Sequence, residues 1–255
     1  LESDDDLTGT GLAFTLGDGN GEICSLIEIM AEPLAGREIE ALMAEFGRLF
    51  RTMADHPRLR WLGPHKGMVH LALASITNAC FDLWSKSRGV PLWRLLVDLS
   101  PSQVVDLLDL SYLEDVMTHE DALDLLTVHV ASKNERQSIL AAGYPGYDTS
   151  IGWFNYSDEQ VRSNIKGAVD AGFTAMKLKV GSAETERDIR RAYMVREVAG
   201  DAAQVMLDVN QSWTLPKAIR TSLALSDMNQ FRIEEPNHPD DVLAHQTLAR
   251  AISHM

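Results

Sequence analysis

The repeat of strand and helix patterns in the carboxyl-terminal part of the chain constrains its fold most. Apolar segments typical of short strands cover residues 148–153, 175–180, 204–209 and 231–234, with helical spacing of apolar residues between them. Strands that alternate with helices of this length predict right-handed βαβ units and a parallel sheet. We therefore expect an α/β fold over residues 143–255.

Local signals indicate where the helices of this repeat begin and end. Ser157 and Gln160 have the spacing of a capping box, which predicts a helix start. Gly172 is a favourable helix stop, because glycine adopts the left-handed conformation that often ends a helix. Thr214, followed by Pro216 in the first turn, predicts the start of the third helix.

The amino-terminal part of the chain has a less regular pattern. Residues 9–16 resemble a strand that runs into the glycine-rich loop 17–21, and residues 68–84 carry apolar side chains at helical spacing. These features predict a first domain over residues 1–105 that contains both strand and helix. Residues 106–142 are rich in acidic and apolar side chains and predict a helical connector.

Two lysines interrupt the second strand segment of the repeat. The side-chain period of two along a strand puts Lys177 and Lys179 on one face and the apolar side chains on the other. If the apolar face packs against helices, both ammonium groups point into the interior of a barrel. Two buried ammonium groups side by side are unfavourable unless anions lie nearby.

The next two strand segments supply such anions. Asp208 and Asn210 share a face at the end of the third segment, and Glu234 and Glu235 end the fourth. The intervals are 29 residues from Lys179 to Asp208 and 26 residues from Asp208 to Glu234, about one βα unit each. Successive parallel strands therefore deliver these groups to one rim, the carboxyl-terminal face where barrel enzymes place catalysis.

Each pattern also has an ordinary structural explanation. A Lys-x-Lys strand is usually half exposed, an Asp-x-Asn segment before a helix often forms a turn or a cap, and Glu-Glu-Pro commonly opens a loop. Their occurrence together, at three successive strand ends, favours a functional site.

The residue types at this rim indicate a particular chemistry. Oxygen ligands without His or Cys suit Mg²⁺ rather than zinc. A lysine beside a second cation is expected to have a lowered pKa, as a general base requires. The combination predicts proton abstraction next to a substrate carboxylate, assisted by a metal ion.

These residues resemble the mandelate racemase branch of the enolase superfamily, in the segments Lys177-Leu178-Lys179, Asp208-Val209-Asn210 and Glu234-Glu235-Pro236. Further segments along the whole chain resemble the L-fuconate dehydratase family: Phe14-Thr15-Leu16-Gly17, Arg60-Trp61-Leu62-Gly63-Pro64, Phe81-Asp82-Leu83-Trp84, Tyr144-Pro145 and Tyr156-Ser157-Asp158. The resemblance implies an α+β capping domain over residues 1–105, followed by a (β/α) barrel.

The resemblance also implies roles for the residues at the rim. Lys179 would remove the proton α to the substrate carboxylate, while Lys177 would tune this base and neutralise the carboxylate. Asp208 and Glu234 would be two of three Mg²⁺ ligands. Asn210 would assist at the rim by binding substrate.

Two further residues are expected to bind substrate from the capping domain. Gly17 begins the loop 17–21, which resembles the mobile capping loop that closes over substrate in the family. Trp61 belongs to a segment shared with the family. A glycine-rich loop and a buried Trp are also ordinary structural features.

The chain departs from the family where its later barrel strands would come. In the family these strands supply the third carboxylate ligand and a His, with an Asp partner, that helps hydroxide leave. A whole barrel needs about 250 residues, whereas residues 143–255 number 113. We therefore expect the chain to be a fragment that holds only the first half of the barrel. Arg232 is a smaller departure, since the family tends to place an apolar residue there.

Composition limits the partners that this chain can bind. It has 23 basic and 37 acidic residues, a net charge of −14, which argues against a nucleic acid as partner. No apolar run approaches the roughly 18 residues that a membrane-spanning helix needs. Cys24 and Cys80 lack metal-ligand spacing and predict two reduced thiols. We expect a cytoplasmic protein that acts on a small sugar acid and is a homo-oligomer when complete.

The leading hypothesis is Mg²⁺-dependent dehydration of L-fuconate to 2-keto-3-deoxy-L-fuconate by the complete protein. Another acid-sugar dehydratase, a racemase or a lactonising enzyme of the same superfamily stays open, as does a non-catalytic relative that binds a metabolite or a partner. A pure binding module has no evident use for two lysines that face carboxylates, which favours an enzyme.

Overall fold

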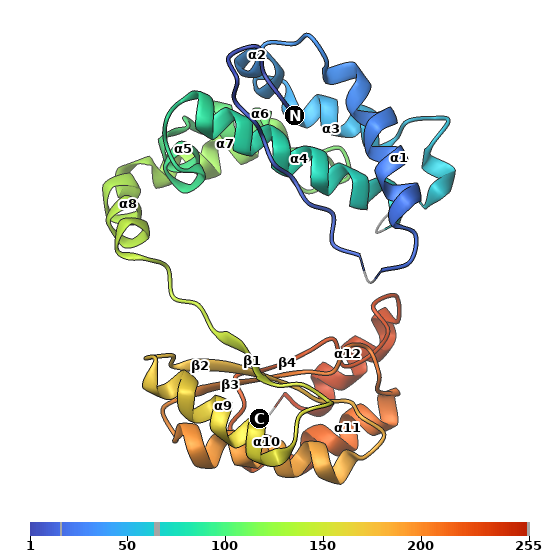
Figure 1. Ribbon diagram of the computed structural model, residues 1–255, viewed down its shortest axis with the longest axis vertical. Coiled ribbons are helices and arrows are strands. Elements are labelled where there is room, and N and C mark those ends of the chain that lie inside the picture. Colours follow the sequence, from blue (N-terminus) through green and yellow to red (C-terminus); the bar gives the residue numbers. More distant parts are fainter. Residues whose placement is uncertain (16, 64–66, 254–255) are drawn as a thin grey trace. The chain divides into compact units, whose positions relative to one another are not determined.

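The computed structural model describes residues 1–15, 17–63 and 67–253 (Figure 1). The chain forms two compact units, Leu1–Tyr144 and Pro145–Met255. Within the described residues, no helix is both long enough and apolar enough to cross a membrane.

The first unit is built of helices. Short 3-10 turns occur at Glu32–Leu34, Arg60–Leu62 and His129–Ser132. The α-helices are α1 (Asn20–Ala31), α2 (Ile39–Met43), α3 (Phe46–Ala54), α4 (Met68–Ser87), α5 (Leu92–Asp98), α6 (Pro101–Asp106), α7 (His119–Val128) and α8 (Lys133–Ala142). Helices α7 and α8, which cover most of the predicted connector, contact α6 and α5 respectively.

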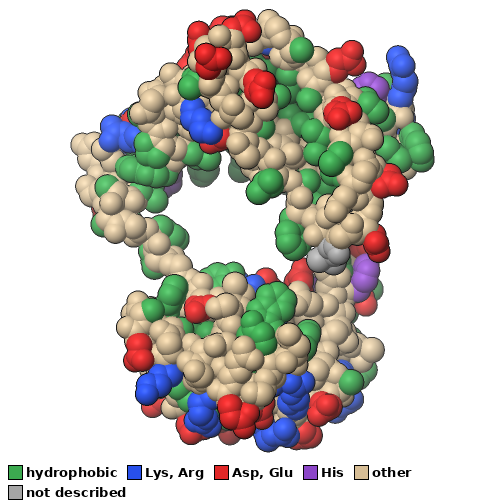
Figure 2. Space-filling model, viewed as in Figure 1, with side chains coloured by type: hydrophobic (Ala, Val, Ile, Leu, Met, Phe, Trp, Pro, Cys, Tyr) green, Lys and Arg blue, Asp and Glu red, His purple; other side chains and the backbone are tan. Residues whose placement is uncertain are grey.

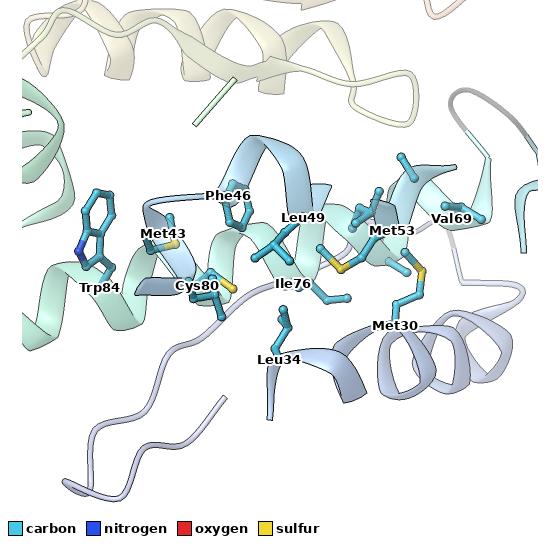
Figure 3. Close-up of a cluster of buried hydrophobic side chains, with 14 of the residues drawn as sticks. Met30, Leu34, Met43, Phe46, Leu49, Met53, Val69, Ile76, Cys80 and Trp84 are labelled. Carbon is cyan, nitrogen blue, oxygen red and sulfur yellow. The ribbon is translucent and has the colours of Figure 1, made fainter. Parts of the chain in front are cut away.

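Helix α4 forms the centre of the first unit's core, as its apolar spacing predicts. Val69, Ile76 and Cys80 are buried along one side of this helix, and α1, α2, α3 and α5 pack around it. Figure 3 shows Ile76 and Cys80 near Leu49 and Phe46 from α3, with Val69 further along the same cluster. The burial of this apolar surface stabilises the unit.

The strand predicted over residues 9–16 is wrong for the part that the structure describes. Residues 9–15 have no strand pairing, Gly9 and Gly11 lie against α4, and Leu16 lies outside the described residues. A Cβ on Gly11 would lie 1.8 Å from the Ser75 carbonyl oxygen, so glycine permits close packing against the helix backbone. The Thr10 amide donates a hydrogen bond to Asp82 Oδ2 (2.7 Å), so this backbone bonds a helix side chain rather than another strand.

The expected α+β character of residues 1–105 is likewise not found in their described part. The described residues of this region contain helices and one isolated bridge, between Glu2 and Thr8, but no strand. The glycine-rich loop is also shorter than predicted, because Asn20 and Gly21 already belong to α1.

The second unit has the predicted alternation of strands and helices. Its elements are β1 (Asp148–Gly152), α9 (Asp158–Asp170), β2 (Ala175–Lys179), α10 (Thr185–Ala199), β3 (Gln204–Asp208), α11 (Leu215–Ala224), a 3-10 turn at Ser226–Met228, β4 (Arg232–Glu234) and α12 (Val242–Ala251). The strands pair in parallel in the order β1-β2-β3-β4, which confirms the predicted parallel sheet.

Helices cover one face of this sheet. Figure 1 shows α9, α10 and α11 on the same side, where Met176, Leu178, Val205 and Leu207 of the strands are fully buried in the core. The outer surface of this helix layer carries intermixed acidic and basic side chains (Figure 2). Lys177, Lys179 and Asp208, which alternate with these buried residues, therefore lie on the opposite face.

The helix ends follow the signals in the sequence. The Ser157 hydroxyl accepts a hydrogen bond from the Gln160 amide (3.1 Å) at the start of α9. Gly172 has a φ of 87° just after the end of α9, as expected for a glycine stop. Pro216 lies in the first turn of α11.

The close approach of Gly11 to α4 generates a stability prediction. Gly11→Ala should lower the free energy of unfolding by roughly 1–3 kcal/mol, because the new methyl group meets a backbone oxygen that cannot move aside easily. Gly21→Ala is the control, since a Cβ there has no neighbour within 4 Å and alanine favours a helix. Urea unfolding followed by circular dichroism measures both, and equal stabilities would contradict this packing.

The two cysteines should differ in reactivity. Burial raises the pKa of the Cys80 thiol to about 11, whereas Cys24 is exposed on α1. At pH 8 a thiol reagent such as Ellman's reagent should modify one cysteine of the folded chain rapidly and both in denaturant, because the thiolate is the reactive form. Cys24→Ser should abolish the rapid reaction, and a rapid reaction that persists in this variant would contradict the burial of Cys80.

Candidate active site

The register of the parallel sheet aligns three charged residues. Lys179 of β2 pairs with Asp208 of β3, and Asp208 pairs with Glu234 of β4. All three occupy the last position of their strands. They form a row across the carboxyl-terminal end of the sheet, as the intervals in the sequence predict.

Both lysines bind the carboxylates of this row. Lys177 Nζ lies 3.0 and 3.1 Å from the two carboxylate oxygens of Glu234 and 3.2 Å from Asp208 Oδ2. Lys179 Nζ donates a hydrogen bond to the same Asp208 oxygen. The side chain of Asp208 is only 3% exposed, so it receives two ammonium groups in a place where water is largely excluded.

The electrostatics of this cluster favour the charged forms. Burial raises the pKa of Asp208, but hydrogen bonds from Lys179 and Lys177 outweigh burial and hold the pKa below its ordinary value. Burial lowers the pKa of Lys177, but Glu234 and Asp208 outweigh it and leave the pKa raised. The cluster therefore raises the pKa of Lys177, because two carboxylates contact its ammonium group.

Two aromatic side chains that the sequence reading missed cover the lysines. The ring centroid of Tyr147 lies 5.3 Å from Lys177 Nζ, and that of Trp153 lies 5.4 Å from Lys179 Nζ. Such positions allow cation–π attraction. Tyr147 immediately precedes β1 and Trp153 immediately follows it. Aromatic residues at both ends of a strand beside the charged strand are the signal that could have identified them.

Asn210 lies beside the row in a left-handed turn. Its φ is 49°, that of Gln211 is 64°, and that of Glu235 is 46°. The Asn210 amide donates to Asp208 Oδ1 (3.1 Å), its side chain donates to Glu235 Oε2 (3.3 Å), and the Gln211 amide donates to the Glu235 carbonyl (2.8 Å). Non-glycine residues in this conformation often mark functional sites. These bonds join the turns that follow β3 and β4.

Gly17 and Trp61 belong to the first unit, and their predicted contact with substrate stays a prediction. Gly17 is exposed with a φ of 115°. Trp61 is 76% exposed rather than buried, and its indole nitrogen donates to the Arg58 carbonyl (2.8 Å). Pro64 of the same segment lies outside the described residues.

The carboxylates of the row suit a magnesium ion as two of its ligands. Asp208 and Glu234 are neighbours in register, and carboxylate oxygens are the ligands that Mg²⁺ prefers. In the part of the chain that the structure describes, no group of three or more His, Cys, Asp or Glu side chains could hold a metal ion. Asp208 and Glu234 can thus supply two ligands of a magnesium ion. Further ligands have to come from water, substrate or other protein groups.

The fold is similar to that of a superfamily of enzymes. Residues 160–255 match the family described as enolase C-terminal domain-like, and the comparisons support the enolase superfamily for this chain. Its mixed α/β fold, with a parallel sheet of four strands, is that of the superfamily.

Individual relatives resemble nearly the whole chain. One is human mitochondrial enolase superfamily member 1, whose crystal structure matches with 38% sequence identity and a TM-score of 0.92. The match covers 99% of this chain and 57% of the human chain. Another relative is L-galactonate dehydratase from Hypocrea jecorina, to which this chain is 36% identical. That match covers 99% of this chain and 57% of the relative.

A more distant structure contains a metal. L-talarate/galactarate dehydratase from Salmonella typhimurium, liganded with Mg and L-lyxarohydroxamate, is 25% identical with a TM-score of 0.68, over 98% of this chain and 52% of that one. The chain thus spans little more than half the length of the relatives that it matches.

Removal of the shared carboxylate should destabilise the second unit in a pH-dependent way. Asp208→Asn should lower the free energy of unfolding by about 2–3 kcal/mol at pH 7, because two buried ammonium groups lose their common anion. The folded-state pKa of Asp208 lies below its ordinary value of 3.8. The carboxylate's contribution is therefore fully present above that value and is lost as the pH falls below it.

Unfolding in urea between pH 7 and pH 3 measures this effect. The difference between the wild-type chain and Asp208→Asn should shrink as the pH falls below 3.8. Asp201→Asn, at an exposed position in the turn before β3, is the control and should stay close to wild type throughout. A difference that is independent of pH would contradict the electrostatic explanation.

Proposed function

We propose that the complete protein is a Mg²⁺-dependent dehydratase of a six-carbon sugar acid. The observation that carries this proposal is the row of Lys179, Asp208 and Glu234 at the ends of neighbouring strands, with Lys177 bound to both carboxylates. The similarity to an L-galactonate dehydratase over 99% of this chain supports the same reaction class.

Lys179 is the base in this proposal. Its neutral amine accepts the proton from the carbon next to the substrate carboxylate, and the electrons of the broken C–H bond form a double bond to the neighbouring carbon as the β-hydroxyl leaves. Water is released, and the resulting enol becomes a 2-keto-3-deoxy acid. Protonation of the leaving hydroxyl needs an acid, for which the family resemblance implies a His from a later strand than β4.

Lys179 has to be released from Asp208 before it can act. In the structure its ammonium group donates to that carboxylate. When Asp208 and Glu234 hold magnesium, the metal supplies positive charge that stabilises the negative charge developing on the substrate carboxylate. In this proposal Lys177, on the same face, neutralises the substrate carboxylate, and the Trp153 ring, 5.4 Å from Lys179 Nζ, shields one side of Lys179 from water.

L-Fuconate and L-galactonate are the substrates to test first. L-Fuconate is the 6-deoxy form of L-galactonate, so the two share their configuration at the reacting carbons and differ in one hydroxyl group. The resemblance in the sequence favours the former, and the relative from Hypocrea jecorina favours the latter. We propose a substrate with this shared configuration and place L-fuconate first.

A racemase is the second candidate, because it would use the same base and metal. The two reactions are separated by their products: a dehydratase gives a 2-keto-3-deoxy acid, whereas a racemase gives the epimer and no loss of water. A non-catalytic relative would give neither product, and no exchange of the α-proton.

The experiment uses the full gene product that contains this chain, with Mg²⁺ and each sugar acid in D₂O. Proton NMR should show loss of the α-proton signal and formation of the keto acid. Lys179→Met should lower turnover at least about 1000-fold, because no other group replaces the base. Lys166→Met, at an exposed position on α9, is the control and should retain turnover. Unchanged turnover in Lys179→Met would rule out this mechanism.

A further inference from the structure

Arg232 lies on the polar face of the sheet, next to the candidate active-site row. It precedes Glu234 by two residues on β4, so both side chains point to the same face. Arg232 pairs in register with Met206, which in turn pairs with Lys177. Lys177, Met206 and Arg232 therefore lie at the same level of the sheet, two residues before the active-site row.

The carboxylate of Glu234 already has cationic partners for both of its oxygens. An Arg232 guanidinium nitrogen donates to Oε2 at 2.8 Å, and Lys177 Nζ lies 3.0 and 3.1 Å from Oε1 and Oε2. The ring of Tyr147 lies beside both cations, 5.3 Å from Lys177 Nζ and 5.7 Å from the Arg232 guanidinium carbon. These contacts fix the position of the Glu234 carboxylate.

The charges of the cluster show what a metal ion would meet there. Lys177, Lys179 and Arg232 supply three positive charges, against the two negative charges of Asp208 and Glu234. A divalent cation at Oε2 of Glu234 competes with the guanidinium for this oxygen and is also repelled by its charge.

We propose that Arg232 competes with Mg²⁺ for Glu234 and thereby lowers the affinity of the site for the metal. The inference rests on the metal site of the proposed function but not on the reaction that follows. An apolar residue at this position would remove one of the two cationic groups that contact Oε2 of Glu234. Arg232 is thus a positioning residue, which acts on the metal through Glu234.

Metal titration of the chain tests this role directly. Mn²⁺ serves as the probe, with free Mn²⁺ followed by electron paramagnetic resonance, and Mg²⁺ is then added to displace it. Arg232→Leu should bind Mn²⁺ and Mg²⁺ about fivefold more tightly than the wild-type chain, the upper end of the effect expected for loss of a partly exposed ion pair. Arg232→Lys keeps the charge and should stay close to wild type.

A second variant separates this local effect from a general change of charge. Arg220→Leu removes the same charge from an exposed position on α11, whose helix covers the opposite face of the sheet. It should bind Mn²⁺ within about twofold of wild type, because exposed charges at a distance are screened. Circular dichroism confirms folding, and Arg232→Gln replaces Arg232→Leu if the latter does not fold.

Several results would overturn the inference. These are an unchanged or weaker Mn²⁺ affinity in Arg232→Leu, an equal gain in Arg220→Leu, or no binding by any of the variants. Failure of the proposed function has a different outcome: the metal affinities change as expected, but the full gene product neither exchanges the α-proton nor releases water.

Discussion

The balance of charge on one face of the parallel sheet is the interaction on which the candidate site depends. Lys177 and Lys179 are largely buried, and their ammonium groups are stable there only because Asp208 and Glu234 reach the same height on the next two strands. A shift of one residue in the register of β3 would turn Asp208 towards the helices. The strand register therefore decides whether this site exists.

The helix layer maintains this register and also holds the loops around the site. Apolar residues on the far face of the strands pack against α9, α10 and α11. On α10, buried Asp188 accepts hydrogen bonds from the Gly181 and Ser182 amides, both 2.8 Å, in the loop after Lys179. Arg191, also on α10, donates to Asp158 (2.7 Å) and to the Trp153 carbonyl (3.2 Å). One helix thus fixes the loops that follow β1 and β2.

The sequence predicted the second unit well and the first unit less well. The strands near residues 148, 175, 204 and 231 were identifiable because each is short, apolar and separated from the next by one helix. The strand prediction over residues 9–16 failed because the same glycine spacing also permits an extended segment to pack on a helix backbone. Periodicity describes one segment at a time and does not identify the surface against which the segment packs.

The sequence by itself determined which charged residues lie at successive strand ends, since the period of two and the length of a βα unit are local properties. Only the tertiary structure decided which cation binds which carboxylate. Lys177 bridges Asp208 and Glu234, Arg232 adds a second cation to Glu234, and Tyr147 lies beside both cations. Such contacts depend on the stagger and twist of neighbouring strands and on side-chain conformations, which residue spacing does not specify.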